Sequence, residues 1–272
     1  MRIKRTALFV VAALALASVL LSPVFAAGSA DLDRVVKSGK LRIGMELGVQ
    51  LRSFMDPATK KPAGMEVDLI NDFCDRIGVK AEIIDITWDG LIPALVSDRI
   101  DVICSGMGRF EKRALTVDFS DPMWTLGQGI AVRKGDTRFK TWADANKAGV
   151  RAGGTLGGLS QMVAQSTLPK ATFKAFPSYN QTGLALMAGQ IDVWVDDDFL
   201  LVDSAKDHPE ITVLPVTSQM QIATGMAVRR GSDLLPLINL FIYNAKKDGL
   251  FERVADKWGL PHAMIAPADP TR

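Results

Sequence analysis

Apolar strand patterns alternate with amphipathic helix patterns along almost the whole chain. Short apolar and β-branched runs predict strands, whereas apolar residues three and four positions apart predict helices. We expect strands at residues 41–45, 80–86, 100–104, 129–133, 150–152, 172–175, 191–195, 211–214 and 224–229. We expect helices at residues 64–77, 88–97, 159–166, 179–188, 198–205, 233–247 and 250–258. This alternation is typical of α/β proteins, in which helices cover mainly parallel sheets.

Two short patterns recur within the chain. The sequence LVSDRIDV at residues 95–102 resembles LMAGQIDV at residues 186–193, and each covers a helix end, a tight turn and a strand start. The sequence AVRKGD at residues 131–136 likewise resembles AVRRG at residues 227–231. Because the two matches have similar offsets along the chain, they predict two lobes of related build.

Glycine-containing segments precede both copies of the second pattern and suit crossings between lobes. A chain that leaves the first lobe near residue 126 and returns near residue 222 forms a two-strand hinge. We therefore expect lobe 1 at residues 31–126 and 222–272, and lobe 2 at residues 127–221. The cleft between the two lobes is the natural site for a ligand.

The first 26 residues have the features of a secretory signal peptide: a basic start, an apolar run and small residues before the expected cleavage after Ala26. They carry three basic residues and no acid, so the formal charge of +2 becomes −1 for the remaining 246 residues. This nearly neutral balance does not favour nucleic acid as a partner. Later apolar stretches fall short of the roughly 20 residues that cross a bilayer, so we expect a soluble periplasmic protein.

The chain has two cysteines, Cys74 and Cys104. In an exported protein they can form one disulfide, but two buried thiols are equally compatible with their spacing. Neither follows the signal peptide directly, so no lipid anchor on an N-terminal Cys is expected.

Common signatures of catalysis and metal binding are absent from the sequence. It contains no His-Glu-x-x-His and no Gly-x-Ser-x-Gly, and its two histidines lie in loop-like sequence. The glycine cluster at residues 153–158 lacks the Lys-Ser/Thr of a P-loop, but N–H groups at a helix start also suit a carboxylate. We expect no catalytic residue, no metal and no cofactor.

Charged residues follow two of the predicted strands, where ligands of open α/β sheets collect. After residues 100–104 comes a small-residue loop with Gly106, leading to the cations Arg109 and Arg113. After residues 191–195 come three aspartates, 196–198. Each group alone is compatible with a solvated loop, but cationic and anionic strand ends in opposing lobes together predict a receptor for a zwitterion.

From about residue 32 to residue 258 the chain resembles the periplasmic solute-binding proteins of polar amino-acid ABC importers, the bacterial extracellular solute-binding protein family 3. The most specific matching stretches are GMEVDL at residues 64–69, WDGLIPAL at 88–95, Arg113 with VDFSDP at 117–122, GGT at 153–155, AGQID at 188–192, Asp197, KDG at 247–249 and Lys257-Trp258. The resemblance implies a two-lobed fold in which each lobe is a mainly parallel sheet covered by helices.

The resemblance also implies roles for residues of lobe 2. Thr155, with the N–H groups of Gly153 and Gly154, matches the part of the family site that clamps the ligand carboxylate. Asp197 matches the aspartate that accepts hydrogen bonds from the α-ammonium.

In lobe 1 the resemblance assigns Arg113 to the α-carboxylate of the ligand. Trp88 matches an aromatic wall over the ligand side chain, although its helix must also bury a face and a core role stays open. Glu46 matches an acid near the side-chain end of the pocket, and Gly106 lies in the small-residue loop of the site.

The chain departs from the family in a loop that usually contains Tyr followed by Pro-Phe. Here the loop reads VQLR at residues 49–52, so an aromatic face is missing and Arg52 adds a cation. Gly108 and Phe110 replace residues that usually carry hydroxyl groups. Recognition of an ammonium is therefore less secure than recognition of a carboxylate. Glu46 favours a cationic ligand whereas Arg52 favours an anionic one, so the individual ligand stays open.

The function implied is the substrate-binding component of an ABC importer: a monomer that closes on a small amino acid or carboxylate and docks on membrane permease subunits. The alternative is a cyclohexadienyl or arogenate dehydratase-like enzyme, which shares the fold. The position of that enzyme's proton-donating glutamate is Leu200 in this chain, so we expect no enzyme activity, with Asp196 or Asp198 left open as a substitute proton donor. A ligand-sensing domain is a third interpretation that also stays open.

Overall fold

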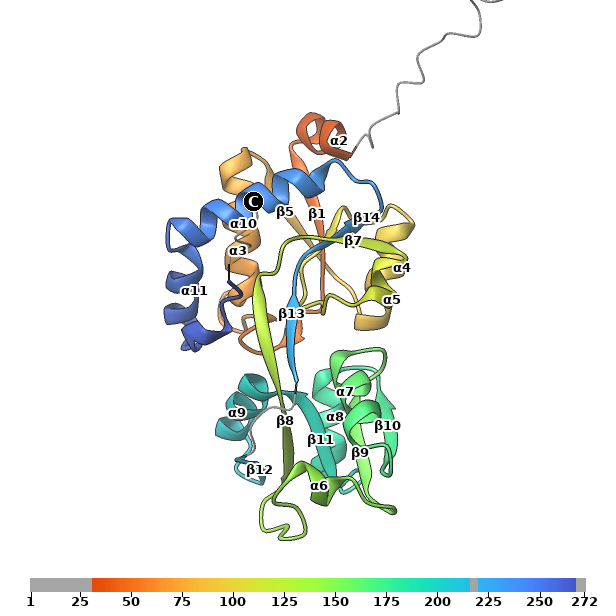
Figure 1. The fold of residues 1–272 in the computed structure, drawn as a ribbon. Helices are drawn as coiled ribbons and strands as arrows, with labels where there is room; N and C mark the ends of the chain where they lie inside the picture. The colour runs from red at the N-terminus through yellow and green to blue at the C-terminus, as the bar shows by residue number, and fades with distance from the viewer. Residues whose placement is uncertain (1–30, 216–219, 268–272) are drawn as a thin grey trace, which may run out of the picture.

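The protein is described by a computed structural model over residues 31–215 and 220–267. The predicted signal peptide, residues 1–26, lies outside the described residues. Two helix-covered sheets form two lobes, and two long strands run between them (Figure 1). The α/β, two-lobed fold expected from the sequence is thereby confirmed. In the described part of the chain, no helix combines the length and apolar character needed to cross a membrane.

The sheet of lobe 1 has the strand order β5-β1-β6-β14-β7. Strand β1 (Lys40–Met45) pairs in parallel with β5 (Lys80–Asp85) and β6 (Val102–Ile103). Strand β14 (Ala227–Arg229) comes from the far end of the sequence and lies antiparallel between β6 and β7 (Val117–Phe119). Lobe 1 is therefore completed by a segment that follows lobe 2 in the chain.

The sheet of lobe 2 has the order β10-β9-β11-β8-β12. Strand β9 (Arg151–Thr155) pairs in parallel with β10 (Thr172–Phe176) and β11 (Val193–Asp197). Strand β8 (Trp124–Arg133) runs antiparallel to β11 and to β12 (Ile211–Val213). In both lobes the parallel strands end at the edge of the sheet that faces the other lobe.

Helices cover both sheets, and a small hairpin sheet borders the cleft. Around lobe 1 lie α2 (Asp31–Ser38), α3 (Met65–Ile77), η1 (Trp88–Gly90), α4 (Leu91–Val96), α5 (Glu111–Ala114), α10 (Leu234–Lys247), α11 (Leu250–Trp258) and η2 (His262–Met264). Around lobe 2 lie α6 (Trp142–Ala145), α7 (Leu159–Thr167), α8 (Tyr179–Met187) and α9 (Asp198–Asp207). The hairpin sheet consists of β2 (Gly48–Val49), β3 (Ser53–Met55) and β4 (Pro62–Ala63).

Helix α3 shows how the sequence pattern produces these elements. Its apolar residues at three- and four-residue spacing, including Met65, Leu69 and Phe73, are fully buried against the sheet. Gly78 ends the helix with a φ of 73°, a left-handed conformation that glycine adopts without steric cost. The helix predicted at residues 64–77 is therefore confirmed with its stop.

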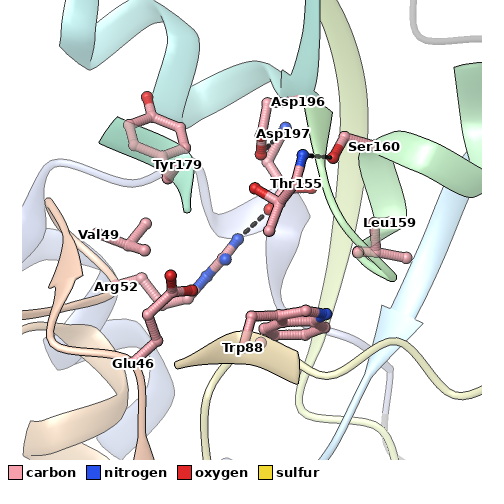
Figure 2. Close-up of a pocket in the computed structure, with 12 residues that line it drawn as sticks. Glu46, Val49, Arg52, Trp88, Thr155, Leu159, Ser160, Tyr179, Asp196 and Asp197 are labelled. Atoms are coloured by element: carbon pink, nitrogen blue, oxygen red, sulfur yellow. Dashed lines mark hydrogen bonds and ion pairs between the residues drawn. The ribbon is translucent and has the colours of Figure 1, made fainter. Parts of the chain in front are cut away.

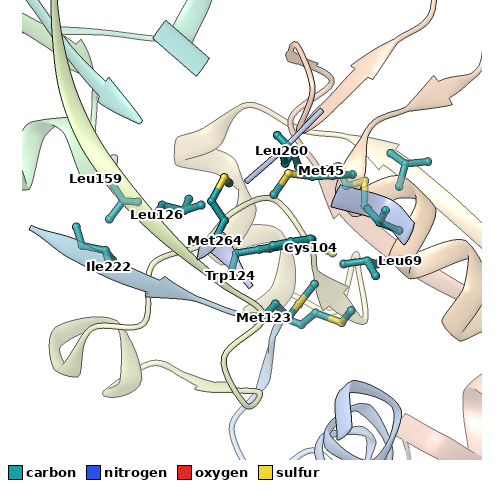
Figure 3. Close-up of a cluster of buried hydrophobic side chains, with 14 of the residues drawn as sticks. Met45, Leu69, Cys104, Met123, Trp124, Leu126, Leu159, Ile222, Leu260 and Met264 are labelled. Carbon is teal, nitrogen blue, oxygen red and sulfur yellow. The ribbon is translucent and has the colours of Figure 1, made fainter. Parts of the chain in front are cut away.

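Strands β8 and β13 (Gln221–Thr224) make the two-strand connection between the lobes. The first half of β8 pairs with β13, with Gln221 opposite Gly127 and Thr224 opposite Trp124. Trp124 is fully buried, and its ring lies 5.1 Å from that of Phe251 in the apolar cluster at the base of this connection (Figure 3). The lobe boundaries at 126/127 and 221/222 stay predictions.

Several predicted elements differ from those observed. The helix expected at 88–97 is divided into η1 and α4, and the strand expected at 100–104 is reduced to β6. The strand expected at 224–229 is divided because the N–H of Gly225 donates to the carbonyl of Met107 rather than continuing a strand ladder. Strand β8 begins five residues earlier than predicted, since polar and glycine residues interrupt its apolar pattern.

The first recurring pattern places one aspartate in the same role in each lobe. Asp101 of lobe 1 accepts from the backbone N–H of Arg42 at 2.9 Å and from its Nε at 3.1 Å. Asp192 of lobe 2 accepts from the backbone N–H of Arg151 at 3.0 Å and from its Nε at 2.9 Å. Each aspartate thus fastens its own strand start to the neighbouring strand, and we call this contact the Asp–Arg clamp.

The second recurring pattern also has matching contacts. Arg229 donates from Nη1 to the carbonyl of Ile100 at 2.7 Å, and Arg133 donates from Nη1 to the carbonyl of Ile191 at 2.6 Å. Both arginines therefore bind the turn that leads into the clamp aspartate. The internal repeat read in the sequence is a repeated polar contact in the structure.

The Asp101→Asn substitution tests how much a buried Asp–Arg clamp contributes to stability. Asp101 is fully buried and Asp98 is 61% exposed, yet both contact the guanidinium of Arg42. We expect Asp101→Asn to lower the free energy of unfolding by about 2–4 kcal/mol, because it removes the charge from a buried, multiply bonded group. Asp98→Asn, the matched control, should cost below about 1 kcal/mol. Equal losses in urea unfolding would contradict the clamp.

Candidate functional site

A small pocket lies between the lobes and is lined by both (Figure 2). Lobe 1 contributes Glu46, Val49, Arg52, Trp88 and Gly106, and lobe 2 contributes Thr155, Gly158, Leu159, Ser160, Tyr179, Asp196 and Asp197. The free volume of the pocket is ≈ 30 Å³, room for about two water molecules. Side chains of the protein itself therefore fill most of this pocket.

The lining residues of lobe 1 come from strand ends. Glu46 directly follows β1, Gly106 follows β6, and Trp88 begins η1 after β5. The three strands are parallel, so their carboxyl ends meet at one edge of the sheet. Arg52 comes from the turn between β2 and β3 and reaches into the pocket from the side.

Lobe 2 presents strand ends and helix starts in the same way. Thr155 ends β9 and Asp197 ends β11, beside Asp196. Helices α7 and α8 begin at the pocket with Leu159 and Tyr179. The structure brings six of the residues predicted from the sequence together in this pocket, and their role in ligand binding stays a prediction: Glu46, Arg52, Trp88, Gly106, Thr155 and Asp197.

The contact that dominates the pocket joins Arg52 to Asp197. The Arg52 Nη2 donates to Asp197 Oδ2, and the other oxygen of Asp197 accepts from the Gln128 side-chain amide. Arg52 is 7% exposed and Asp197 is 2% exposed. The guanidinium of one lobe is thus bonded to the aspartate of the other in a site almost free of solvent.

Arg113 lies at the mouth of the cleft, beside the pocket rather than in its lining. Its Nη1 donates to the carbonyl of Gly108 at 3.0 Å, and its Nη2 donates across the cleft to the carbonyl of Gly157 at 2.8 Å. Its Cζ lies 5.4 Å from the centre of the Trp88 ring and 5.3 Å from that of Phe110. Burial lowers the pKa of Arg113 to about 10. Within the described ranges no carboxylate pairs with this guanidinium, so it can accept an anionic ligand group.

Two lining carboxyl groups have raised pKa values. Burial raises the pKa of Glu46 to about 7, although the positive charge of Arg52 acts in the opposite direction. Burial, reinforced by the adjacent charge of Asp197, also raises the pKa of Asp196. Both groups bind a proton more readily than free carboxylates, and in the neutral form each can donate a hydrogen bond.

The structure does not bring Gly153 and Gly154 to the pocket. Both lie within strand β9, where a Cβ on Gly153 would meet Ile191 and one on Gly154 would lie 2.6 Å from Ser160 Oγ. The N–H of Thr155 already donates to Ser160 Oγ at 2.9 Å. These glycines are required for packing behind the site, and of this segment the Thr155 side chain faces the pocket.

The family follows from comparison of the chain with known proteins. The model of the bacterial extracellular solute-binding proteins, family 3, matches residues 41–261. The chain belongs to this family.

Several family members are similar over most of their length. The chain is 30% identical to the L-arginine-binding protein of Pseudomonas aeruginosa over 89% of this chain and 92% of the relative. It is 31% identical to the glutamine-binding protein of Geobacillus stearothermophilus over 70% of this chain and 73% of the relative. Among solved structures, an ancestral amino-acid-binding protein described as a precursor of cyclohexadienyl dehydratase superposes with a TM-score of 0.77, at 33% identity over 84% of this chain and 98% of that chain.

Sequence reasoning missed some residues of this family 3 site. Gln128 lies in the connecting strand β8 and is fully buried, yet its amide supports Asp197. The signal was a polar residue between two glycines in an otherwise apolar strand. Tyr179 and Ser160 were assigned only to helices, because their closeness to the cleft depends on where those helices begin.

The described part of the chain offers no group of three His, Cys, Asp or Glu side chains arranged to hold a metal. Cys74 and Cys104 are both buried with free thiols, so of the two arrangements left open by their spacing the structure shows the unbonded one. The polar chemistry of the cleft therefore lies in guanidinium, carboxyl and hydroxyl groups.

The raised pKa of Glu46 predicts a pH-dependent stability. The pKa is about 7 in the folded protein against an ordinary value of 4.5, so stability falls as the pH rises from about 4.5 through 7, where the buried group becomes charged. We expect Glu46→Gln to be more stable than the wild type by about 2 kcal/mol at pH 8 and nearly equal at pH 4.5.

Urea unfolding at the two pH values measures this difference. Glu82→Gln, at a side chain that is 47% exposed, is the matched control and should change stability by below about 0.5 kcal/mol at either pH. A Glu46→Gln effect that does not depend on pH would contradict the assignment.

Proposed function

We propose that this family 3 protein is the periplasmic substrate-binding component of an ABC importer and holds an amino acid or related small carboxylate between its lobes. The observation that carries the proposal is the partly buried guanidinium of Arg113, which bridges the cleft mouth and has no carboxylate partner among the described residues. A partly buried cation at the edge of a two-lobed cleft suits the carboxylate of a small solute.

The named relatives support the class of ligand. The similar proteins are named for binding glutamine, L-arginine and L-cystine. A structure titled as an ancestral arginine-binding protein bound to arginine superposes with a TM-score of 0.73 at 33% identity, over 81% of this chain and 98% of that chain. Carboxylate recognition is the feature that these different amino acids share.

The proposed residue roles follow from the geometry. Arg113 binds the ligand carboxylate together with the hydroxyl of Thr155, and Trp88 forms the apolar wall beside it. Glu46 and Gly106 line the far side of the pocket. Gly153 and Gly154 position Thr155 from behind rather than touching the ligand.

Transport requires that ligand binding change the surface that the protein presents to its membrane partner. Contacts from Arg113 in lobe 1 and Thr155 in lobe 2 favour the closed arrangement of the lobes over the open one. We propose that the closed monomer, exported by its cleaved signal peptide, then docks on the permease subunits. In this proposal the two lobes are residues 127–221 and residues 31–126 with 222–272, and they move relative to each other as the cleft closes.

Arg113→Ala tests the proposed ligand site. A thermal-shift screen of amino acids and small mono- and dicarboxylates first identifies ligands, since a solute that binds the folded state raises the melting temperature. Calorimetry should then show that Arg113→Ala weakens binding at least about tenfold, through loss of a charge-assisted contact. Lys112→Ala removes the neighbouring exposed charge and should keep the wild-type affinity. Unchanged affinity in Arg113→Ala would refute the carboxylate role.

The enzyme alternative is disfavoured by the residue three positions after Asp197. Leu200 is buried in α9 and does not line the pocket, and its side chain cannot transfer a proton. We therefore expect no release of phenylpyruvate when purified protein is incubated with prephenate. Absorbance of the product at alkaline pH measures this directly, and turnover that scales with protein concentration would establish the enzyme instead.

A further inference from the structure

The aspartate expected to bind the amine of a ligand is already bound to a cation of the protein. Resting on the proposed function, we propose that Arg52 occupies the position beside Asp197 where a ligand amine would bind, which we call the amine seat. The solute is then a small carboxylate without an ammonium group on its α-carbon. Arg52 would then determine the specificity of the cleft.

Both oxygens of Asp197 are engaged. Oδ2 accepts from Arg52 and Oδ1 accepts from Gln128, while the backbone N–H of Asp197 donates to Asp196 at 2.9 Å. An α-ammonium arriving at this carboxylate must displace a guanidinium that is itself buried, or lie beside a like charge. Either alternative is unfavourable in a site with almost no solvent.

Arg52 is held in place by the chain on either side of it. Leu51, the residue before it, has a φ of 62°, a left-handed conformation that is strained for a branched side chain. The carbonyls of Leu51 and Arg52 accept from the N–H groups of Met65 and Glu66 at 2.7 and 3.2 Å, so this turn is fastened to the start of α3. The position of Arg52 is therefore built into the loop rather than chosen freely by a surface side chain.

Gly106 and Glu66 complete the seat around the Arg52 side chain. A Cβ on Gly106 would lie 2.6 Å from Arg52 Nε and 2.8 Å from its Cζ, so only glycine leaves room for the guanidinium. Glu66 is 2% exposed, accepts from the N–H of Gly106 at 2.7 Å and attracts Arg52 electrostatically.

The hydrogen-bond donors left in the cleft suit oxygen atoms. Arg52 Nε is buried without a partner among the described groups, and Arg113 donates only to two main-chain carbonyls. Burial favours the neutral forms of Glu46 and Asp196, which can also donate. A carboxylate with a carbonyl, a hydroxyl or a second carboxylate matches these donors, whereas an α-ammonium would bring another cation to Arg52.

Matched pairs of solutes test this specificity. Calorimetry is run with L-glutamate and 2-oxoglutarate, L-leucine and 4-methyl-2-oxopentanoate, and L-phenylalanine and phenylpyruvate. For a pair that binds, the wild type should hold the 2-oxo acid at least about tenfold tighter than the amino acid. Arg52→Gln, and Arg52→Ala as a second variant if the first does not fold, should reverse this preference. Arg99→Ala removes an exposed arginine of the same lobe and should leave the preference unchanged.

A double-mutant cycle tests the seat without any ligand. The unfolding free energies of wild type, Arg52→Gln, Asp197→Asn and the double variant should show strong coupling between the two positions. Coupling near zero, or a wild type that binds amino acids as tightly as their 2-oxo partners, would overturn the proposal. Strong coupling in a protein that binds no solute of the wider thermal-shift screen would count against the proposed function and leave the Arg52 seat standing.

Discussion

The cleft is organised around the bond between Arg52 of lobe 1 and Asp197 of lobe 2. Each group has lost nearly all contact with water, and a buried charge without a partner would be strongly unfavourable. Any opening of the lobes would separate these charges and rehydrate them. The relative position of the lobes is thus linked to charge pairing inside the cleft, before any solute is considered.

The sheets bring this pair together through their strand ends and register. Asp197 is the last residue of β11, and in the antiparallel pairing of β11 with β8 it stands opposite Gln128. Gln128 therefore belongs to a strand that runs between the lobes and also supports the acid in the pocket. The connection between the lobes and the position of Asp197 therefore depend on the same strand.

Much of the fold was readable from the sequence because its signals are local. The apolar periodicity of α3, its glycine stop and the repeated turn before Asp101 and Asp192 each depend on neighbouring residues. The aspartates at 196–198 were readable as candidate site residues because strand ends are predictable positions in α/β sheets, whereas the roles of Thr155 and Asp197 were implied by the family resemblance.

The contact between Arg52 and Asp197 was not readable, since it joins residues 145 positions apart across two lobes. A charged residue in a turn gives no sign of which acid it will meet. Gly153 and Gly154 show the reverse case. Their backbone N–H groups were expected to face a ligand carboxylate, whereas in the structure both lie within β9 and their missing side chains allow close packing against Ile191 and Ser160.

The carbonyl contacts that Arg133 and Arg229 make beside the two Asp–Arg clamps are alike in geometry but differ in how much chain they enclose. Arg133 reaches a carbonyl 58 residues away, within one continuous stretch, whereas Arg229 reaches its equivalent across 129 residues. During synthesis from the N-terminus, both partners of the Arg133 contact are present once residue 191 has been made. The equivalent contact in lobe 1 must wait for Arg229, so the half of the molecule that begins the sequence is the half whose assembly finishes last.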